Sequence, residues 1–189
     1  MPLLDHFGIV APLYEKFISP AEPERLCELL ELPVSGPLLD AGGGTGRVAQ
    51  HLRGQGGPVI VADFSQKMLL EACRKEGIFA VRAPAETLPF EDETFPRIIM
   101  VDALHHVHSQ VRTAAELWRV LQPGGRIVIE EPDVHRWGVK VMAVLEKLAL
   151  MRSRILSPER IAALFAGFPA KIRVLPDGFE AYVVVEKPV

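Results

Sequence analysis

The sequence predicts an α/β protein built on a doubly wound, mostly parallel sheet of seven strands. Two observations predict it: short, nearly continuous apolar runs alternate with amphipathic stretches, and only a Pro-Asp-Gly turn separates the last two runs. Continuous apolar runs are typical of parallel strands covered by helices on both faces, whereas a tight turn joins antiparallel strands. The expected strands are residues 37–41, 58–63, 78–83, 97–103, 126–132, 171–176 and 180–187.

Helical spacing of apolar residues fills the intervals between these runs. The expected helices are residues 3–18, 23–32, 45–53, 65–76, 109–121 and 157–166. A further apolar helix at residues 139–152 is not needed by any crossover between strands. We therefore expect a single domain over residues 1–189. It would comprise an N-terminal helical cap (1–35), a ligand-binding core (36–133) and a helical insertion (134–156) that could close over a substrate.

Composition excludes several classes of protein. The 189 residues are 49% hydrophobic with a net charge of −3, which argues against a basic nucleic-acid-binding protein. The charge is uneven, because residues 134–189 carry 9 Lys/Arg against 5 Asp/Glu, a net charge of +4. No apolar run approaches the roughly 18 residues of a membrane span. Cys27 and Cys73 lack metal or redox spacing, so we expect reduced, buried thiols in a cytoplasmic protein.

The segment LLDAGGGTGR, residues 38–47, follows a predicted strand and opens a predicted helix. This arrangement gathers backbone N–H groups and is typical of a nucleotide cradle. The dinucleotide fingerprint G-x-G-x-x-G fails in both registers, because its third glycine would fall on Arg47 or its second on Thr45. The pattern present is an acid followed by G-x-G-x-G, with Gly43 expected to be an ordinary spacer. The pattern residues are Asp40, Gly42, Gly44 and Gly46.

Two acids indicate which nucleotide the loop binds. Asp40 at the end of the first strand would repel a pyrophosphate and suits a cationic ligand. S-adenosylmethionine has no phosphate and carries a sulfonium and an ammonium group, so the electrostatics favour it over NAD. Asp63 ends the second strand and can accept hydrogen bonds from the ribose hydroxyls that both cofactors share. An alternative role for Asp63, as N-cap of the helix beginning after Ser65, stays open.

Five segments in motif order resemble the class I S-adenosylmethionine-dependent methyltransferases, especially the small-molecule group that includes ubiquinone/menaquinone C-methyltransferases. They are LLDAGGGTGRVA, VADFSQKML, APAETLPF, ALHHV and ELWRVLQPGGRIVIEEP, within residues 36–132. The resemblance implies a Rossmann-like fold with strand order 3-2-1-4-5-7-6 and an antiparallel seventh strand. It also implies a methyltransferase that uses S-adenosylmethionine.

The resemblance further implies a set of cofactor contacts. Asp40 would lie near the methionine moiety, Gly42, Gly44 and Gly46 would lie under that moiety, and Asp63 would contact the ribose. Against the adenine it places Phe64, Met68 and the backbone of Ala85. One departure is Pro84, which stands where the family usually has an Asp that accepts from the adenine amino group. Adenine recognition would then use backbone or Glu86, and a non-catalytic protein that binds S-adenosylmethionine or S-adenosylhomocysteine stays an alternative.

The loop VDALHHVH after the fourth strand holds the catalytic candidates. His106 is the favoured general base, because the resemblance places a histidine there and imidazole titrates near neutral pH. His105 and Asp102 are further candidates. A purely structural role, as histidines at a helix entry and an Asp capping the loop, stays open for all three. No metal site is expected.

His135, Arg136 and Trp137 follow the fifth strand and could form one wall of a substrate pocket. The apolar helix at 139–152 could be its lid, which would suit an aromatic or lipophilic small molecule. Carbon or oxygen is favoured over nitrogen as the methyl acceptor. Nucleic acid is not expected as a partner, because residues 102–105 read Asp-Ala-Leu-His in place of the Asn/Asp-Pro-Pro-aromatic motif of amino-methylating enzymes.

Overall fold

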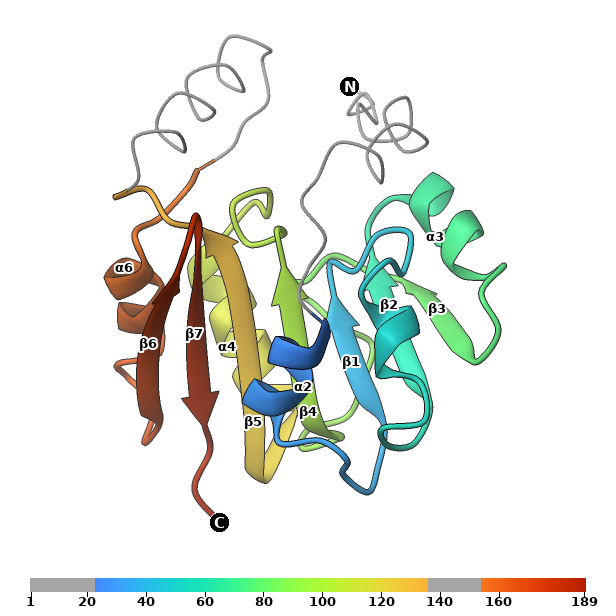
Figure 1. Ribbon diagram of the computed structural model, residues 1–189, viewed down its shortest axis with the longest axis horizontal. Coiled ribbons are helices and arrows are strands. Elements are labelled where there is room, and N and C mark those ends of the chain that lie inside the picture. Colours follow the sequence, from blue (N-terminus) through green and yellow to red (C-terminus); the bar gives the residue numbers. More distant parts are fainter. Residues whose placement is uncertain (1–22, 136–153) are drawn as a thin grey trace, which may run out of the picture.

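The computed structural model describes residues 23–135 and 154–189, which form a seven-stranded sheet between two layers of helices (Figure 1). The strand order is β3-β2-β1-β4-β5-β7-β6. β7 is antiparallel to both of its neighbours, and the other described pairs are parallel. The predicted sheet is therefore confirmed. Its strands are β1 (Leu38–Ala41), β2 (Val59–Asp63), β3 (Ile78–Arg82), β4 (Phe95–Val101), β5 (Leu121–Pro132), β6 (Lys171–Asp177) and β7 (Glu180–Glu186).

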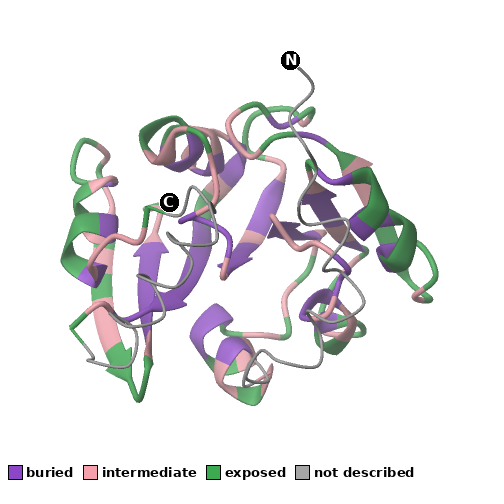
Figure 2. Ribbon diagram, turned by 90° about the horizontal axis from the view of Figure 1, so that it is seen from above, coloured by how far each residue is buried: buried purple, intermediate pink, exposed green. Residues whose placement is uncertain are grey.

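Each face of the sheet has its own apolar core, because successive side chains of a strand point to opposite faces. On one face, Leu39 and Ile98 join side chains of α4 (Gln110–Val120) and α6 (Pro158–Ala163). On the other face, Leu38 and Ile99 join α2 (Pro23–Leu30), the 3₁₀ helix η1 (Ala49–Leu52) and α3 (Gln66–Ala72). Figure 2 shows the central strands largely buried and the outer sides of these helices exposed. Burial on both faces explains the continuous apolar runs of the sequence.

The C-terminal hairpin turns one residue later than the Pro-Asp-Gly sequence suggests. Asp177 pairs with Glu180, so the turn consists of Gly178 and Phe179. Gly178 has a φ of +59°, a conformation that glycine adopts without steric cost. The antiparallel pairing of β6 with β7 that the turn predicts is confirmed.

Three expectations need correction. The helix expected at 45–53 is only the single turn η1, because Gly46 has a φ of +73° and cannot belong to a right-handed helix. The fifth strand begins at Leu121, directly after α4, because Leu121 pairs with Phe95 before the register shifts. Cys27 is only half-buried and Cys73 is exposed. The helices expected at 3–18 and 139–152 lie outside the described residues.

No helix of the described residues is long and apolar enough to cross a membrane. The longest of them is α4, with 11 residues.

Arg126, on β5, joins the N-terminal helix to the sheet. Its guanidinium is buried and donates to the Leu29 carbonyl of α2 at 2.8 Å. It also donates to the carboxylates of Glu31 at 2.7 Å and Glu186 at 3.1 Å. A buried cation that satisfies a helix-end carbonyl and two acids leaves unpaired groups behind when it is removed.

We expect Arg126→Ala to lower the free energy of unfolding by about 2–4 kcal/mol, because it leaves Glu186 and the Leu29 carbonyl without their buried donor. Urea denaturation followed by circular dichroism measures the change. Arg173→Ala is the matched control, because the exposed Arg173 donates to the same Glu186 oxygen at 3.2 Å. That variant should lose no more than about 1 kcal/mol. Equal losses in the two variants would contradict a special role for Arg126.

Candidate cofactor and acceptor site

The glycine loop turns sharply at the carboxyl end of β1. Gly42 has a φ of +73°, and a Cβ at this position would lie 2.6 Å from the Ala103 Cβ. Its amide donates to the Ala62 carbonyl of β2 at 2.7 Å. Gly44 and Gly46 also adopt positive φ values, of +53° and +73°. The backbone conformation of all three pattern glycines therefore disfavours a side chain.

Gly43 differs from the expectation of an ordinary spacer. A Cβ at this position would lie 2.3 Å from the Asp40 Cγ, so any side chain would force Asp40 to move. The sequence pattern did not reveal this contact, because it depends on how the loop folds back over the end of β1. The run of three glycines thus keeps the space above the Asp40 carboxyl free of side chains.

Asp63 anchors the glycine loop to the end of β2. One carboxylate oxygen accepts the Gly44 amide at 2.9 Å, and the other accepts the Ser65 amide at 2.7 Å. Helix α3 has its own N-cap, because the Ser65 hydroxyl accepts from the Met68 amide. Asp63 therefore precedes the N-cap of α3 and binds the backbone of the glycine loop through one carboxylate oxygen.

The Asp40 carboxyl is buried. Its side chain is 1% exposed, and neither carboxylate oxygen has a hydrogen-bond partner of good geometry among the described residues. Burial, and secondarily the charge of Asp63, raises the pKa of Asp40 to about 7. The charge of Arg47 and the backbone amide of Ala49 oppose this shift. A cation placed next to the loop would favour the ionised form.

Asp102 follows β4 and connects this strand to the glycine loop. Its φ of +51° is unusual for a residue with a side chain, and such strain is concentrated at functional sites. Arg47, which ends the loop sequence, approaches the Asp102 carboxylate at 3.6 Å. The loops after β1 and β4 therefore meet through an ion pair.

Phe64 and Met68, expected against the adenine, differ in exposure. Phe64 is 59% exposed, and the guanidinium of Arg82 lies 5.7 Å from the centre of its ring. Met68 is buried, and a Cβ at Gly44 would lie 3.6 Å from its sulfur. Met68 is therefore packed beneath the loop, while the Phe64 ring presents a free face to solvent.

The loop after β3 lies against the start of α4. The Ala83 amide donates to the Asp63 carbonyl at 3.0 Å, which continues the pairing of β3 with β2. Glu86 accepts the Ser109 amide at 2.9 Å. This bond occupies one Glu86 oxygen, and the half-buried Ala85 precedes it in the same loop.

His105 is held by an acid that the sequence analysis missed. It is 4% exposed, and its Nδ1 lies 2.5 Å from the Glu131 carboxylate of β5. The other Glu131 oxygen accepts the Leu104 amide at 2.7 Å. Glu131 thus fixes both the backbone and the ring of this loop. The signal in the sequence was an acidic pair, residues 130–131, inside an otherwise apolar strand.

The His106 ring lies 3.9 Å from the His105 ring, centre to centre. Burial, with a smaller contribution from the nearby His105, lowers the pKa of His106 to about 3. Such an imidazole is neutral at every working pH, but it is a weak proton acceptor. The role of His106 as a general base stays a prediction, and the low pKa of its imidazole argues against that role.

Glu180, at the start of β7, is a second acid that the sequence analysis missed. Burial, followed by the charges of Asp102 and Glu131, raises its pKa to about 7. Its Oε2 atom has no hydrogen-bond partner among residues 23–135 and 154–189. β7 runs antiparallel, so its first residue reaches the same edge as the carboxyl ends of β4 and β5. An acid opening an apolar run was the only signal in the sequence.

The expected substrate wall is only partly described. His135 is exposed, and its Nε2 lies 3.2 Å from the Glu159 carboxylate of α6. Arg136 and Trp137 lie outside the described residues.

Known proteins share both the sequence pattern and the fold of this chain. Residues 39–129 match the family model described as a methyltransferase domain. The demethylmenaquinone methyltransferase of Tropheryma whipplei (strain Twist) is 30% identical over 191 residues, covering 96% of this chain and 77% of that protein. The C-methyltransferase UbiE of Marinomonas sp. (strain MWYL1), named for ubiquinone and menaquinone biosynthesis, is 38% identical over 104 residues. That match covers 50% of this chain and 41% of the relative.

A solved structure from Thermotoga maritima shares the fold. It is described as an S-adenosylmethionine-dependent methyltransferase and possible histamine N-methyltransferase. It superposes with a TM-score of 0.78 at 22% identity and covers 96% of this chain and 97% of its own. Together with the relatives above, the strand order and the glycine loop bear out the resemblance of the five motifs. The chain belongs to the class I S-adenosylmethionine-dependent methyltransferases, as a distant relative of the ubiquinone/menaquinone C-methyltransferases.

Proposed function

We propose that this protein binds S-adenosylmethionine at the glycine loop and transfers its methyl group to a small-molecule acceptor. Carbon or oxygen is favoured over nitrogen as the acceptor atom. The observation that carries the proposal is the buried Asp40 carboxyl beneath the loop, whose oxygens have no hydrogen-bond partner of good geometry among the described residues. An acid in this position is costly to the fold and suits a cationic ligand.

The residues around the loop fit this cofactor. Asp40, Asp63 and Asp102 surround the loop. The basic side chains there are engaged, because Arg47 pairs with Asp102 and Lys75 donates to a carbonyl of the loop. Asp63 is proposed to accept the ribose hydroxyls, and the exposed Phe64 ring to cover the adenine. S-adenosylmethionine supplies a methyl group that is already activated by its sulfonium. The protein has to bind and align the two reactants and to exclude water from them. It needs a base only for an acceptor that must lose a proton.

The acceptor is proposed to lie on the other side of the loop, beside residues 102–106. His106 is held neutral there, and Glu131 fixes the His105 ring. Because its low pKa makes His106 a weak base, this environment suits an acceptor that is already nucleophilic. We propose an aromatic or lipophilic acceptor, in line with the relatives named for demethylmenaquinone and ubiquinone/menaquinone methylation.

The domain organisation and location also remain proposals. We propose one domain; most of the helical insertion expected at 134–156 lies outside the described residues. A cytoplasmic location is supported by the free thiols of Cys27 and Cys73.

Isothermal titration with S-adenosylmethionine and S-adenosylhomocysteine tests the cofactor assignment. We expect both to bind, and Asp63→Ala to weaken binding at least about tenfold, because hydrogen bonds to a charged group contribute roughly 1.5–3 kcal/mol each. Asp92→Ala is the control, because this exposed acid pairs with Arg119 on the surface. Its affinity should change less than about twofold. No binding of either nucleoside at millimolar concentration would refute the proposal.

Catalysis is tested separately, by the formation of S-adenosylhomocysteine with a panel of phenolic, quinol and fatty acceptors. Turnover of any of them would exclude the alternative of a non-catalytic cofactor-binding protein. Tight binding without turnover across the panel would favour that alternative, which the replacement of the usual adenine-site Asp by Pro84 also motivates.

The raised pKa of Asp40 predicts that cofactor binding depends on pH. A cationic ligand favours the carboxylate, so the protein should release up to one proton on binding near pH 7. Affinity should rise up to about tenfold between pH 6 and pH 8, as the pKa of about 7 is passed. Titration calorimetry in buffers of different ionisation enthalpy counts the protons. Asp40→Asn removes this titration and leaves that of the ligand itself, so an unchanged pH profile in the variant would contradict the assignment.

The lowered pKa of His106 predicts a small effect of its removal. We expect His106→Ala to lower kcat less than about tenfold, and the pH profile of kcat to lack an imidazole limb near pH 6–7. The exposed His51 of η1 provides a control variant, His51→Ala. A loss in kcat of about 100-fold or more, seen only in His106→Ala, would instead identify His106 as the base.

A further inference from the structure

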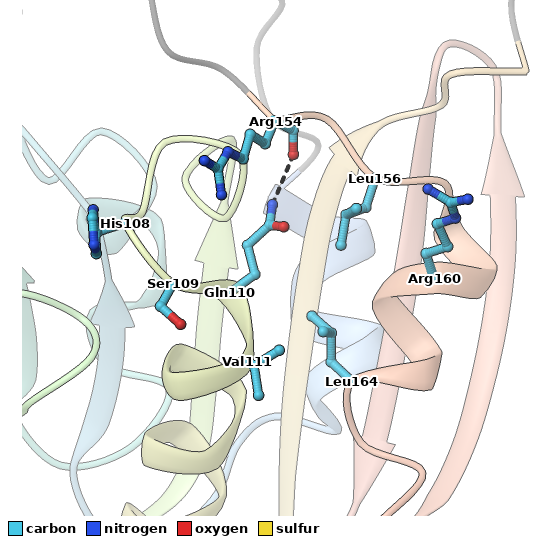
Figure 3. Close-up of a pocket in the computed structure, with 8 residues that line it drawn as sticks. All are labelled: His108, Ser109, Gln110, Val111, Arg154, Leu156, Arg160 and Leu164. Atoms are coloured by element: carbon cyan, nitrogen blue, oxygen red, sulfur yellow. Dashed lines mark hydrogen bonds between the residues drawn. The ribbon is translucent and has the colours of Figure 1, made fainter.

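A pocket of about 380 Å³ lies between the N-terminal ends of α4 and α6 (Figure 3). This volume is in the range of small-molecule sites. The lining residues come from the loop before α4, from α4 itself, from the segment before α6 and from α6. They are His108, Ser109, Gln110, Val111, Arg154, Leu156, Arg160 and Leu164. The cofactor expectations of the sequence analysis used none of them.

The floor of the pocket is apolar. Val111 of α4 is 66% exposed, although its side chain is aliphatic. Leu156 and Leu164 are half-buried and extend the core on this face of the sheet. Figure 3 shows the three side chains between the two helices. An exposed aliphatic surface inside a pocket favours a ligand with a hydrocarbon part.

The rim of the pocket is basic, and its charges are free. Neither the Arg154 nor the Arg160 guanidinium has an ion pair or hydrogen-bond partner among the described residues. Apart from Arg112, every other described arginine side chain has such a partner. The free arginines therefore gather at this end of α4 and α6. Arg112 lies in the first turn of α4 but does not line the pocket.

The nearby acids are already engaged elsewhere. Glu86 accepts the Ser109 amide, and Glu159 pairs with His135 at 3.2 Å. The N-terminus of the 11-residue helix α4 adds a partial positive charge at the pocket. The balance of charge at the rim therefore favours an anion, and guanidinium groups bind carboxylate and phosphate with matching geometry.

The pocket is joined to the loop that holds the catalytic candidates. The Arg154 amide donates to the His105 carbonyl at 2.9 Å. The Gln110 side chain donates to both the Arg154 carbonyl, at 2.8 Å, and the Leu104 carbonyl, at 3.1 Å. A ligand in the pocket therefore borders the proposed acceptor side of the site.

We propose that this pocket binds the methyl acceptor by an anionic group, a carboxylate or a phosphate, held by Arg154 and Arg160. The apolar floor holds the hydrocarbon part next to that group. The assignment to the acceptor rests on the proposed function, and it names the chemical class of the substrate: an amphiphilic anion.

The test titrates wild-type protein, with and without S-adenosylhomocysteine, with matched probes followed by ligand-observed NMR. Benzoate and phenyl phosphate are the anionic probes, benzyl alcohol and phenol their neutral counterparts, and inorganic phosphate the anion without a hydrocarbon part. We expect each anionic probe to bind about tenfold more tightly than its counterpart and than inorganic phosphate. The preference should shrink as the salt concentration rises from about 50 to 500 mM.

Arg154→Gln and Arg160→Gln should each reduce the anion preference about three- to fivefold, and the double variant should abolish it. Arg112→Gln is the matched control, because it removes an equally free arginine of the same helix that does not line the pocket. This variant should keep the preference within about twofold. S-adenosylhomocysteine should bind all four variants like wild type, which shows that they are folded.

The outcomes separate the two proposals. If S-adenosylhomocysteine does not bind, the proposed function fails and the assignment to the acceptor falls with it. If it binds but the anionic probes show no preference, or inorganic phosphate alone binds as tightly as phenyl phosphate, the inference is wrong and the proposed function stands. An equal loss of the anion preference in Arg112→Gln would mean that the preference arises from general surface charge and not from the pocket, and it would also overturn the inference.

Discussion

The hydrogen bond between the Gly44 amide and the Asp63 carboxylate fixes the site, because it holds the glycine loop of β1 against the end of β2. The loop lies at the point where the strand order reverses, since β1 pairs with both β2 and β4. Ligands of doubly wound sheets bind at this point. With the loop folded over the sheet edge, Asp40 is buried beneath it and Arg47 pairs with Asp102, which follows β4. One backbone amide and one carboxylate thus position the acids that are proposed to bind the cofactor.

This arrangement leaves the carboxyl edge of the sheet with few hydrogen-bond donors for its acids. Asp40 and Glu180 both have pKa values raised to about 7, in each case chiefly because burial disfavours the charged form. Neither has a full set of partners among the described residues. Buried polar groups without partners destabilise a fold, so their presence at one edge of the sheet indicates a functional demand there.

The features that depend on short stretches of sequence could be predicted. Strand positions follow from apolar periodicity, and Asp40 and Asp63 from their spacing around the glycines. Contacts between stretches that are distant in the sequence could not be predicted. Glu131 and Glu180 lie near His105 and Asp102 only because β4 and β5 end, and β7 begins, at one edge of the sheet. The low pKa of His106 arises from burial that a favourable imidazole pattern does not reveal. Arg154 and Arg160, far from α4 in sequence, line a pocket with it through the fold.

Acidic side chains lie on one side of the proposed acceptor region and arginines on the other, and we expect this difference to orient a substrate. Asp102, Glu131 and Glu180 lie at the sheet edge, whereas Arg154 and Arg160 lie at the pocket between α4 and α6. Unlike charges attract and like charges repel most strongly where water is partly excluded. An amphiphilic anion is therefore drawn to the arginines by its charged end and repelled from the edge by the same end. Its uncharged part then points toward the glycine loop, which is the end that has to meet an activated methyl group.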